Sequence, residues 1–258
     1  MFLTFEPYQP YQFFKFPISM KSSNPTAITV AEMRAIEHDA QVGGISALQM
    51  MQTAGHNAAQ ALADYLREHW PPDRPARILF LCGPGNNGGD GLVCAAALFD
   101  LTTRGQFGNG AIGALTLQIY LLRARKEDDP VFQPVRVRGI FVADAESDLR
   151  WRVFLQLIGH ANIVVDAVLG IGTSRPIGSH LKEMLDEVRR VRQLKREEGG
   201  PLLIALDGVS GMNYDTGELD PNSVAADVTI TFHAPKHGHF RSPAKEASGA
   251  LLVAGIGV

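Results

Sequence analysis

Residues 78–91 read Ile-Leu-Phe-Leu-Cys-Gly-Pro-Gly-Asn-Asn-Gly-Gly-Asp-Gly, and they are the most informative segment for the fold class. Its four apolar residues predict a buried strand over 78–81, and its glycines predict a loop before a helix that begins near Leu92. Glycine has no Cβ, so a ligand can approach the backbone closely, and the N-terminus of the following helix offers N–H groups without intrahelical partners. The stretch therefore predicts a cradle for a phosphate or ribose group.

The glycines also match the spacing of a dinucleotide-binding motif, since Gly83, Gly85 and Gly88 fit G-x-G-x-x-G. That motif needs an acidic residue about twenty residues later for the ribose hydroxyls. Residues 101–126 contain no Asp or Glu, which disfavours an ordinary nicotinamide-dependent oxidoreductase. The neighbouring carboxamides of Asn86 and Asn87 instead suit hydroxyls, an amide or a hard monovalent cation.

Composition places the chain among single-domain globular proteins, because 258 residues with 45% hydrophobic content can bury one sizeable core. The 24 basic and 27 acidic residues give a net charge of −3. No basic stripe is interleaved with aromatic residues, so no nucleic-acid partner is expected. The two cysteines, Cys82 and Cys94, form no C-x-x-C pair. They predict a reducing, cytoplasmic location without a disulfide or a zinc site.

The first 26 residues differ from the rest of the chain, since they are rich in Phe, Tyr and Pro and carry Glu6. They contain no apolar run long enough to span a bilayer and no clean signal-peptide core. We therefore predict a non-globular arm over residues 1–26, a domain over residues 27–258, and no membrane partner.

Two capping boxes predict helices at the start of the domain, Thr29 with Glu32 and Ser46 with Gln49. The second helix has a narrow face at Gly55 and Ala58, which predicts close packing. After Pro72, short apolar runs alternate with helical stretches, which indicates an α/β fold with a mostly parallel sheet covered on both faces. The predicted strands are 78–81, 115–122, 163–165, 202–206, 228–232 and 251–254, and residues 102–113 are interpreted as a loop, either a surface excursion or a lid.

Polar residues follow several of the predicted strands directly. Asp166 ends one strand, Asp207 and Ser210 follow the next, and Lys236 lies shortly after a third. Because ligands of open parallel sheets bind at the carboxyl ends of the strands, these side chains are expected to converge with Asn87 at one edge.

Five segments together resemble the NAD(P)H-hydrate epimerase family, also called the YjeF N-terminal-domain family, which includes apolipoprotein A-I-binding relatives. The resemblance extends from Ile28 to Val258. The segments are Gly83-Pro-Gly-Asn-Asn-Gly-Gly-Asp-Gly91, Val165-Asp-Ala-Val-Leu-Gly170, Leu206-Asp-Gly-Val-Ser-Gly211, Thr216-Gly217 and Thr231-Phe-His-Ala-Pro-Lys236.

The resemblance implies a Rossmann-like three-layer αβα sandwich, a homodimer, and interconversion of the R and S forms of hydrated NADH or NADPH, which is the substrate rather than a cofactor. It also implies a potassium ion held by Asn87, Asp166 and Ser210. Many members are fused to an NAD(P)H-hydrate dehydratase domain, so a fused or separate dehydratase is an implied partner. The implied substrate-binding residues are Asn86, Asn87, Gly88, Gly89, Asp90, Gly170, Ile171, Gly172, Thr173, Ser174, Arg175, Pro176 and Asp207.

The implied reaction requires a proton donor and acceptor. Loss of the C6 hydroxyl, driven by the ring nitrogen lone pair, leaves a planar iminium, and water returning to the other face inverts the centre. A buried carboxyl group with a pKa nearer neutrality suits this role. We favour Asp207 over Asp90 or solvent, and Lys236 either stabilises charge, orients Asp207 or contacts phosphate.

Two further alternatives stay open at the sequence level. The same fold serves as a non-catalytic nucleotide- or protein-binding scaffold, for example in messenger-RNA decapping, although the retained acids favour an enzyme. The spacing of His233, His237 and His239 resembles a metal site, but Pro235 and Gly238 prevent one regular face.

Overall fold

The computed structural model describes residues 26–103, 115–172, 176–195 and 200–258. Residues 1–25 of the predicted arm, residues 104–113 of the predicted 102–113 loop and the segment 173–175 therefore lie outside the described residues. The division into arm and domain stays a prediction.

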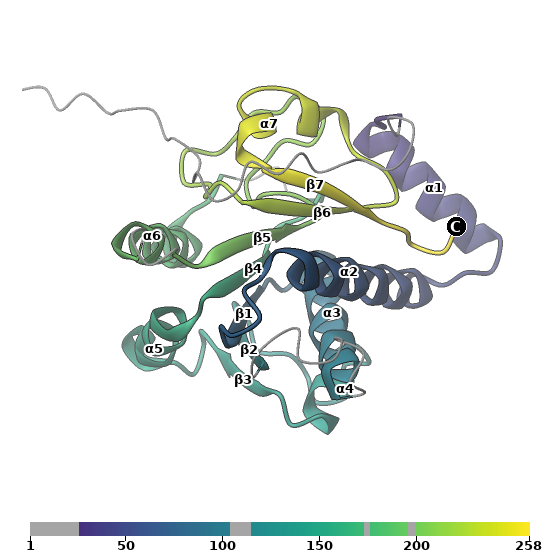
Figure 1. The fold of residues 1–258 in the computed structure, drawn as a ribbon. Coiled ribbons are helices and arrows are strands. Elements are labelled where there is room, and N and C mark those ends of the chain that lie inside the picture. The colour runs from purple at the N-terminus through teal and green to yellow at the C-terminus, as the bar shows by residue number, and fades with distance from the viewer. Residues whose placement is uncertain (1–25, 104–114, 173–175, 196–199) are drawn as a thin grey trace, which may run out of the picture.

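The centre of the fold is a seven-stranded sheet with the order β3-β2-β1-β4-β5-β6-β7, in which every neighbouring pair is parallel (Figure 1). Helices lie on both faces, which confirms the predicted three-layer αβα sandwich. The strands are β1 (Ala76–Cys82), β2 (Leu115–Leu121), β3 (Phe141–Asp144), β4 (Ile163–Ala167), β5 (Leu202–Leu206), β6 (Val228–Phe232) and β7 (Ala250–Ala254).

The helices divide between the two faces of the sheet. α2 (Ala47–His69), α3 (Asn86–Thr103) and α4 (Gln133–Val137) cover one face, and α5 (Arg152–His160) and α6 (Ser179–Leu194) cover the other. The remaining helical segments are α1 (Val30–Val42), η1 (Leu149–Trp151), η3 (His237–Phe240) and α7 (Ala244–Ala247).

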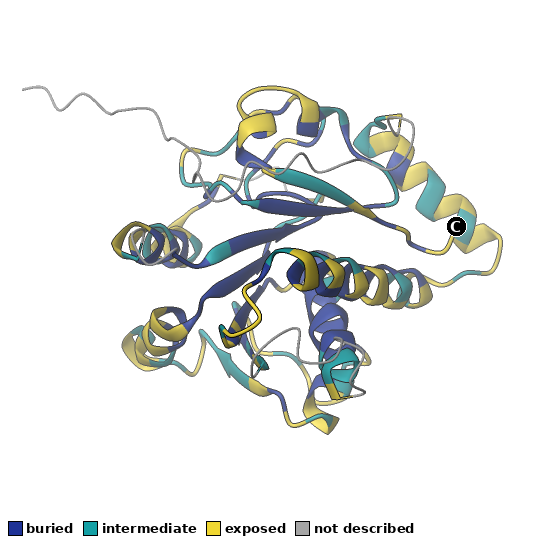
Figure 2. Ribbon diagram, in the orientation of Figure 1, coloured by how far each residue is buried: buried dark blue, intermediate teal, exposed yellow. Residues whose placement is uncertain are grey.

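Strand β1 shows why the central strands are apolar along their whole length. Ile78 and Phe80 pack into the core under α2 and α3, whereas Leu79 and Leu81 pack into the core on the opposite face. Both faces of the strand are removed from water, as the dark interior of Figure 2 shows. A strand buried on both faces reads as a continuous apolar run.

Local signals in the first two helices are confirmed. Thr29 and Glu32 form a reciprocal capping box at α1, and Ser46 and Gln49 form one at α2. The close packing predicted at Gly55 is also present, because a Cβ added there would lie 2.5 Å from the Cβ of Val93 on α3.

Two predictions about elements were wrong. The edge strand β3 was missed, because it has four residues and its first, Phe141, is exposed, so no apolar run marks it. The predicted loop before Leu92 is in fact the start of α3, which begins at Asn86. Packing overrides the low helix propensity of glycine there, since a Cβ added to Gly91 would lie 2.6 Å from the Cβ of Ala167.

No helix in the described ranges combines the length and the apolar character that crossing a bilayer requires. Both cysteines are buried free thiols.

Candidate active site

A cavity of about 500 Å³ lies at the carboxyl ends of β1, β4, β5 and β6. It is the place where a parallel sheet of this kind binds its ligand. Eight of the predicted site residues line it, namely Asn86, Asn87, Asp90, Gly170, Ile171, Gly172, Asp207 and Lys236.

The other predicted site residues lie elsewhere. Gly88 and Gly89 are buried in the first turns of α3, and Asp166 and Ser210 lie beneath the cavity wall. Pro176 lines a neighbouring cavity of about 370 Å³ that shares Ile171 with the first. Thr173, Ser174 and Arg175 fall outside the described residues.

Two glycines of the 83–91 segment, Gly83 and Gly88, allow close backbone packing inside the protein. A Cβ on Gly88 would lie 1.8 Å from the carbonyl oxygen of Gly83, and a Cβ on Gly83 would lie 2.1 Å from that of Val168. The loop after β1 is therefore pressed against the start of α3 and against the segment after β4. This close approach directs the N-terminus of α3, where N–H groups lack intrahelical partners, toward the cavity.

Arg125 holds the same loop in place, a role that sequence reasoning did not predict. Its Nη2 donates to the carbonyl oxygens of Gly83 and Gly85, each at 3.1 Å, while its Nη1 pairs with Asp129 at 3.1 Å. The two carbonyls thus point to the guanidinium, away from the cavity. A guanidinium with donors at fixed angles suits this double contact.

Asp207 and Lys236 form a buried ion pair in the cavity wall, with Nζ donating to Oδ1 at 2.7 Å. Nζ also donates to Thr231 Oγ1 at 3.1 Å and to the carbonyl oxygen of Phe232 at 3.0 Å. These three bonds use all three ammonium protons, so the geometry fits an orienting role toward Asp207 better than a phosphate contact. The other carboxylate oxygen, Oδ2, faces Gly170, where an added Cβ would lie 3.5 Å away.

Asp166 and Ser210 form a second buried pair. Ser210 Oγ donates to Asp166 Oδ1 at 2.6 Å, and the Ser210 N–H donates to Oδ2 at 3.0 Å. Burial raises the pKa of Asp166, and the bonds from Ser210 oppose that rise. Leu169 connects this pair with Asn87, because its N–H donates to Ser210 Oγ at 3.0 Å and its carbonyl oxygen accepts from Asn87 Nδ2 at 3.0 Å.

The Oδ1 atom of Asn87 is buried and has no hydrogen-bond partner among the described residues. A buried oxygen without a donor is costly unless a ligand, water or cation satisfies it. The residues predicted for potassium therefore fit a hard monovalent cation, with one unsatisfied carboxamide oxygen beside a carboxylate and a hydroxyl. No group of three or more His, Cys, Asp or Glu side chains in the described ranges is arranged so that it could hold a metal ion.

The histidines predicted as a possible metal site do not form one. Both ring nitrogens of His239 are within 3.0 Å of backbone groups, those of Lys236 and Asp207. No metal can take either nitrogen without breaking one of these contacts.

Helix α1 brings three residues to the cavity that sequence reasoning missed, Met33, Arg34 and Glu37. The helix is fixed there by a bridge between Ile28 and the segment around Lys236, with Ile28 N–H donating to the carbonyl oxygen of Pro235 at 2.9 Å. The spacing of Met33 and Glu37 puts them on one face of α1. Nothing local indicates that this face covers the cavity.

Glu37 and Asp90 place two more carboxyl groups in the wall beside Asp207. Burial raises the pKa of Glu37, and the negative charge of Asp207 adds to the rise. Asp90 lines the cavity but is largely withdrawn from bulk water, and this raises its pKa well above the ordinary value. Asp207 and Glu37 add to that rise, and Lys236 opposes it. The cavity thus holds a carboxyl group that keeps its proton more strongly than a free aspartic acid does.

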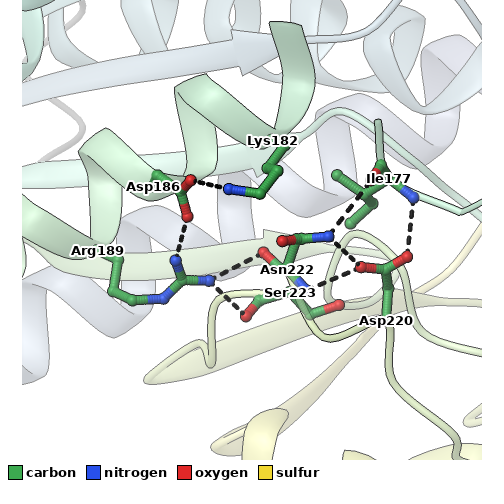
Figure 3. A network of polar contacts seen from close by, with 7 residues as sticks. All are labelled: Ile177, Lys182, Asp186, Arg189, Asp220, Asn222 and Ser223. Carbon is green, nitrogen blue, oxygen red and sulfur yellow. Dashed lines mark hydrogen bonds and ion pairs between the residues drawn. The ribbon is translucent and has the colours of Figure 1, made fainter. Parts of the chain in front are cut away.

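A polar network fixes the segment that follows the 170–176 loop (Figure 3). Asp220 accepts from the Ile177 N–H at 2.8 Å, and Arg189 of α6 donates to the carbonyl oxygen of Asn222 at 3.1 Å. Ser223 Oγ donates to the Ser210 carbonyl oxygen at 2.8 Å. The network therefore ties α6 and the β5–β6 connection to the buried Asp166 and Ser210 pair.

Comparison with known proteins finds relatives that match the part of the chain that contains this site. The profile of the family described as YjeF-related protein N-terminus matches residues 47–238. A bifunctional NAD(P)H-hydrate repair enzyme Nnr of Hyperthermus butylicus is 29% identical over 237 residues, covering 90% of this chain and 38% of that protein. One of Coxiella burnetii is 30% identical over 228 residues, covering 88% and 40%.

An NAD(P)H-hydrate epimerase of Rhodopirellula baltica is 28% identical over 218 residues, covering 81% of this chain and 75% of that protein. The crystal structure of yeast ynu0 superposes with a TM-score of 0.64 at 21% identity, covering 83% of each chain, which supports the fold. The chain spans about two fifths of the length of the bifunctional relatives.

Proposed function

Since the chain belongs to the family described as YjeF-related protein N-terminus, we propose that it interconverts the R and S forms of hydrated NADH and NADPH at C6 of the nicotinamide ring. The observation that carries this proposal is the cavity at the sheet edge, where Asp90, Asp207 and Lys236 meet the N-terminus of α3. The relative of similar length is named an NAD(P)H-hydrate epimerase, which supports the same reaction.

The chemistry needs one group that gives a proton and one that takes a proton. In one direction Asp90 in its acid form, instead of the Asp207 favoured from the sequence, donates a proton to the C6 hydroxyl, because its raised pKa keeps it protonated. The C–O bond breaks, and the ring nitrogen lone pair forms the iminium. Water then adds to the opposite face of C6, and the Asp207 carboxylate accepts its proton. The reverse direction exchanges the two roles, so no oxidant or reductant is consumed.

The protein residues also bind and orient the dinucleotide. The first turn of α3, which includes Asn87, and the 170–172 segment contact its phosphates and ribose, and Asn86 offers its carboxamide to its hydroxyls. A potassium ion held by Asn87, Asp166 and Ser210 would supply positive charge near the pyrophosphate. We further propose that the protein forms a homodimer and acts in the cytoplasm. We also propose a dehydratase partner, either joined to this chain or separate, which the bifunctional relatives support.

The experiment that tests the function mixes the purified protein with a single epimer of hydrated NADPH and follows the other epimer by chromatography. Acceleration above the spontaneous rate is the expected result. A rate equal to the spontaneous one would reject the epimerase and favour the non-catalytic scaffold.

Replacing potassium by tetramethylammonium is expected to lower both activity and the melting temperature, because a cation bound only to the native state stabilises it. We expect a loss of about 3 °C, which corresponds to roughly 1 kcal/mol for a domain of this size. Asn87→Ala, which removes the unpartnered oxygen, should make the melting temperature independent of potassium. Equal melting and activity in both salts would remove the cation from the proposal.

Asp90→Asn is expected to change the pH dependence as well as the rate. Asp90 must be protonated to donate, so kcat should fall as pH rises through its raised pKa. The variant should be slower and should lack this alkaline limb, which a kcat profile from pH 5 to 9 would measure. If the variant still loses kcat at alkaline pH as the wild type does, the titrating group is not Asp90.

A further inference from the structure

His239 links the two backbone segments that carry the Asp207 and Lys236 pair. Its Nδ1 accepts the backbone N–H of Lys236 at 3.0 Å, and its Nε2 lies 3.0 Å from the carbonyl oxygen of Asp207. The ring is 3% exposed, does not line the cavity, and packs edge-on against Tyr214 with 5.7 Å between ring centroids. The ring thus contacts a residue that lies 32 positions earlier in the chain.

We propose that His239 is a positioning residue, which holds the Asp207 carboxylate and the Lys236 ammonium in the geometry that the reaction needs. The inference rests on the proposed epimerase function and extends it to a residue that never touches the substrate.

The two contacts determine the protonation state of the ring. A backbone N–H can only donate, so Nδ1 must be the acceptor, and a carbonyl oxygen can only accept, so Nε2 must carry the hydrogen. Only the neutral Nε2–H form satisfies both contacts, because the imidazolium would place a proton on Nδ1, facing the Lys236 N–H. Burial lowers the pKa of His239 to about 4; Asp207 opposes this and the charge of Lys236 adds to it.

Asp207 needs such support because its backbone is unusual. Its φ is +65°, in the left-handed region that L-residues other than glycine rarely adopt. The backbone turns here directly after β5, with the Asp207 N–H donating to the Ile230 carbonyl oxygen at 2.8 Å. The hydrogen bond from His239 fixes the carbonyl on the other side of the same residue. Together the two bonds determine the direction in which the Asp207 side chain leaves the backbone.

The same ring fixes Lys236 from the opposite direction. The Lys236 carbonyl oxygen accepts the His239 N–H at 3.0 Å, while its N–H donates to the ring, so both backbone polar groups of Lys236 are bonded to His239. The Lys236 ammonium is then placed 2.7 Å from Asp207 Oδ1. Loss of the contact between the ring and the Asp207 carbonyl oxygen would release the backbone of Asp207, whereas the backbone of Lys236 would stay bonded to His239.

Two substitutions separate the contacts. In His239→Asn the carboxamide ends near the position of Nδ1, so it keeps an acceptor for Lys236 and loses the bond to Asp207. In His239→Gln the carboxamide reaches the position of Nε2, so it keeps a donor for Asp207. We expect His239→Asn to lower kcat about 30-fold with little change in KM, because a small misplacement of a catalytic group costs up to about 100-fold. His239→Gln should restore kcat to within about 5-fold of the wild type.

Single-epimer turnover at saturating substrate measures kcat, and the melting temperature of each variant is the control for folding. Wild-type kcat in His239→Asn, or equal losses in the two variants at equal melting temperature, would overturn the positioning role.

Nitrogen-15 NMR of the histidine rings tests the inference without an activity assay. Its result can be interpreted even if the wild type proves not to be an epimerase. His239 in the wild type should show the neutral Nε2–H form from pH 5.5 to 8. The Nδ1–H form, or an imidazolium at pH 7, would refute it whatever the assay gives.

Discussion

Replacing Asp207 with asparagine is expected to lower kcat by about 1,000-fold while the affinity for the hydrated dinucleotide changes little, since proton transfer by a placed side chain contributes about 100- to 10,000-fold. The variant keeps the shape of the side chain but removes the carboxylate that takes the proton. Turnover of a single epimer of hydrated NADPH, with calorimetric measurement of dinucleotide binding, tests this expectation. A kcat within about 3-fold of the wild type would remove Asp207 from proton transfer.

The ion pair requires a control for stability. Asp207→Asn leaves the Lys236 ammonium buried without its counter-charge, and breaking a buried pair costs about 3–5 kcal/mol. The double variant Asp207→Asn with Lys236→Met removes both charges and should recover most of the lost unfolding free energy. It should stay as inactive as the single variant. Recovery of activity together with stability would mean that the single variant was merely unfolded.

Replacing Gly88 with alanine is expected to lower the free energy of unfolding by about 3 kcal/mol or more, which urea denaturation would measure. The added Cβ would lie 1.8 Å from the Gly83 carbonyl oxygen, so the loop after β1 and the start of α3 must separate. Helix propensity alone predicts the opposite sign, because alanine is favoured over glycine inside a helix by about 1 kcal/mol. The experiment therefore decides between local propensity and backbone packing.

Gly85→Ala is the matched control. It lies in the same segment, one residue before α3, and nothing lies within 4 Å of its added Cβ. We expect its unfolding free energy to stay within about 1 kcal/mol of the wild type. Equal stability of Gly88→Ala and the wild type would contradict the close approach of Gly83 and Gly88.

The sequence alone determined those parts of the protein that depend on near neighbours along the chain. Strands such as β1 and β4 are buried on both faces, so their apolar runs marked them. The capping boxes at Thr29 and Ser46 marked the starts of α1 and α2. The motif resemblance likewise predicted Asn87, Asp207 and Lys236 as site residues, and the structure places all three in one cavity wall.

The surroundings of those residues depend on contacts between elements that are distant in the chain. The tertiary structure showed that the glycine run begins a helix, that Glu37 and Arg34 of α1 cover the cavity, and that Arg125 holds the glycine loop. Hydrophobic periodicity reports which face of an element is buried and not which distant element buries it. The contact of His239 with Asp207, 32 residues away in the chain, exists because the sheet order puts β5 beside β6, and no local pattern contains that order.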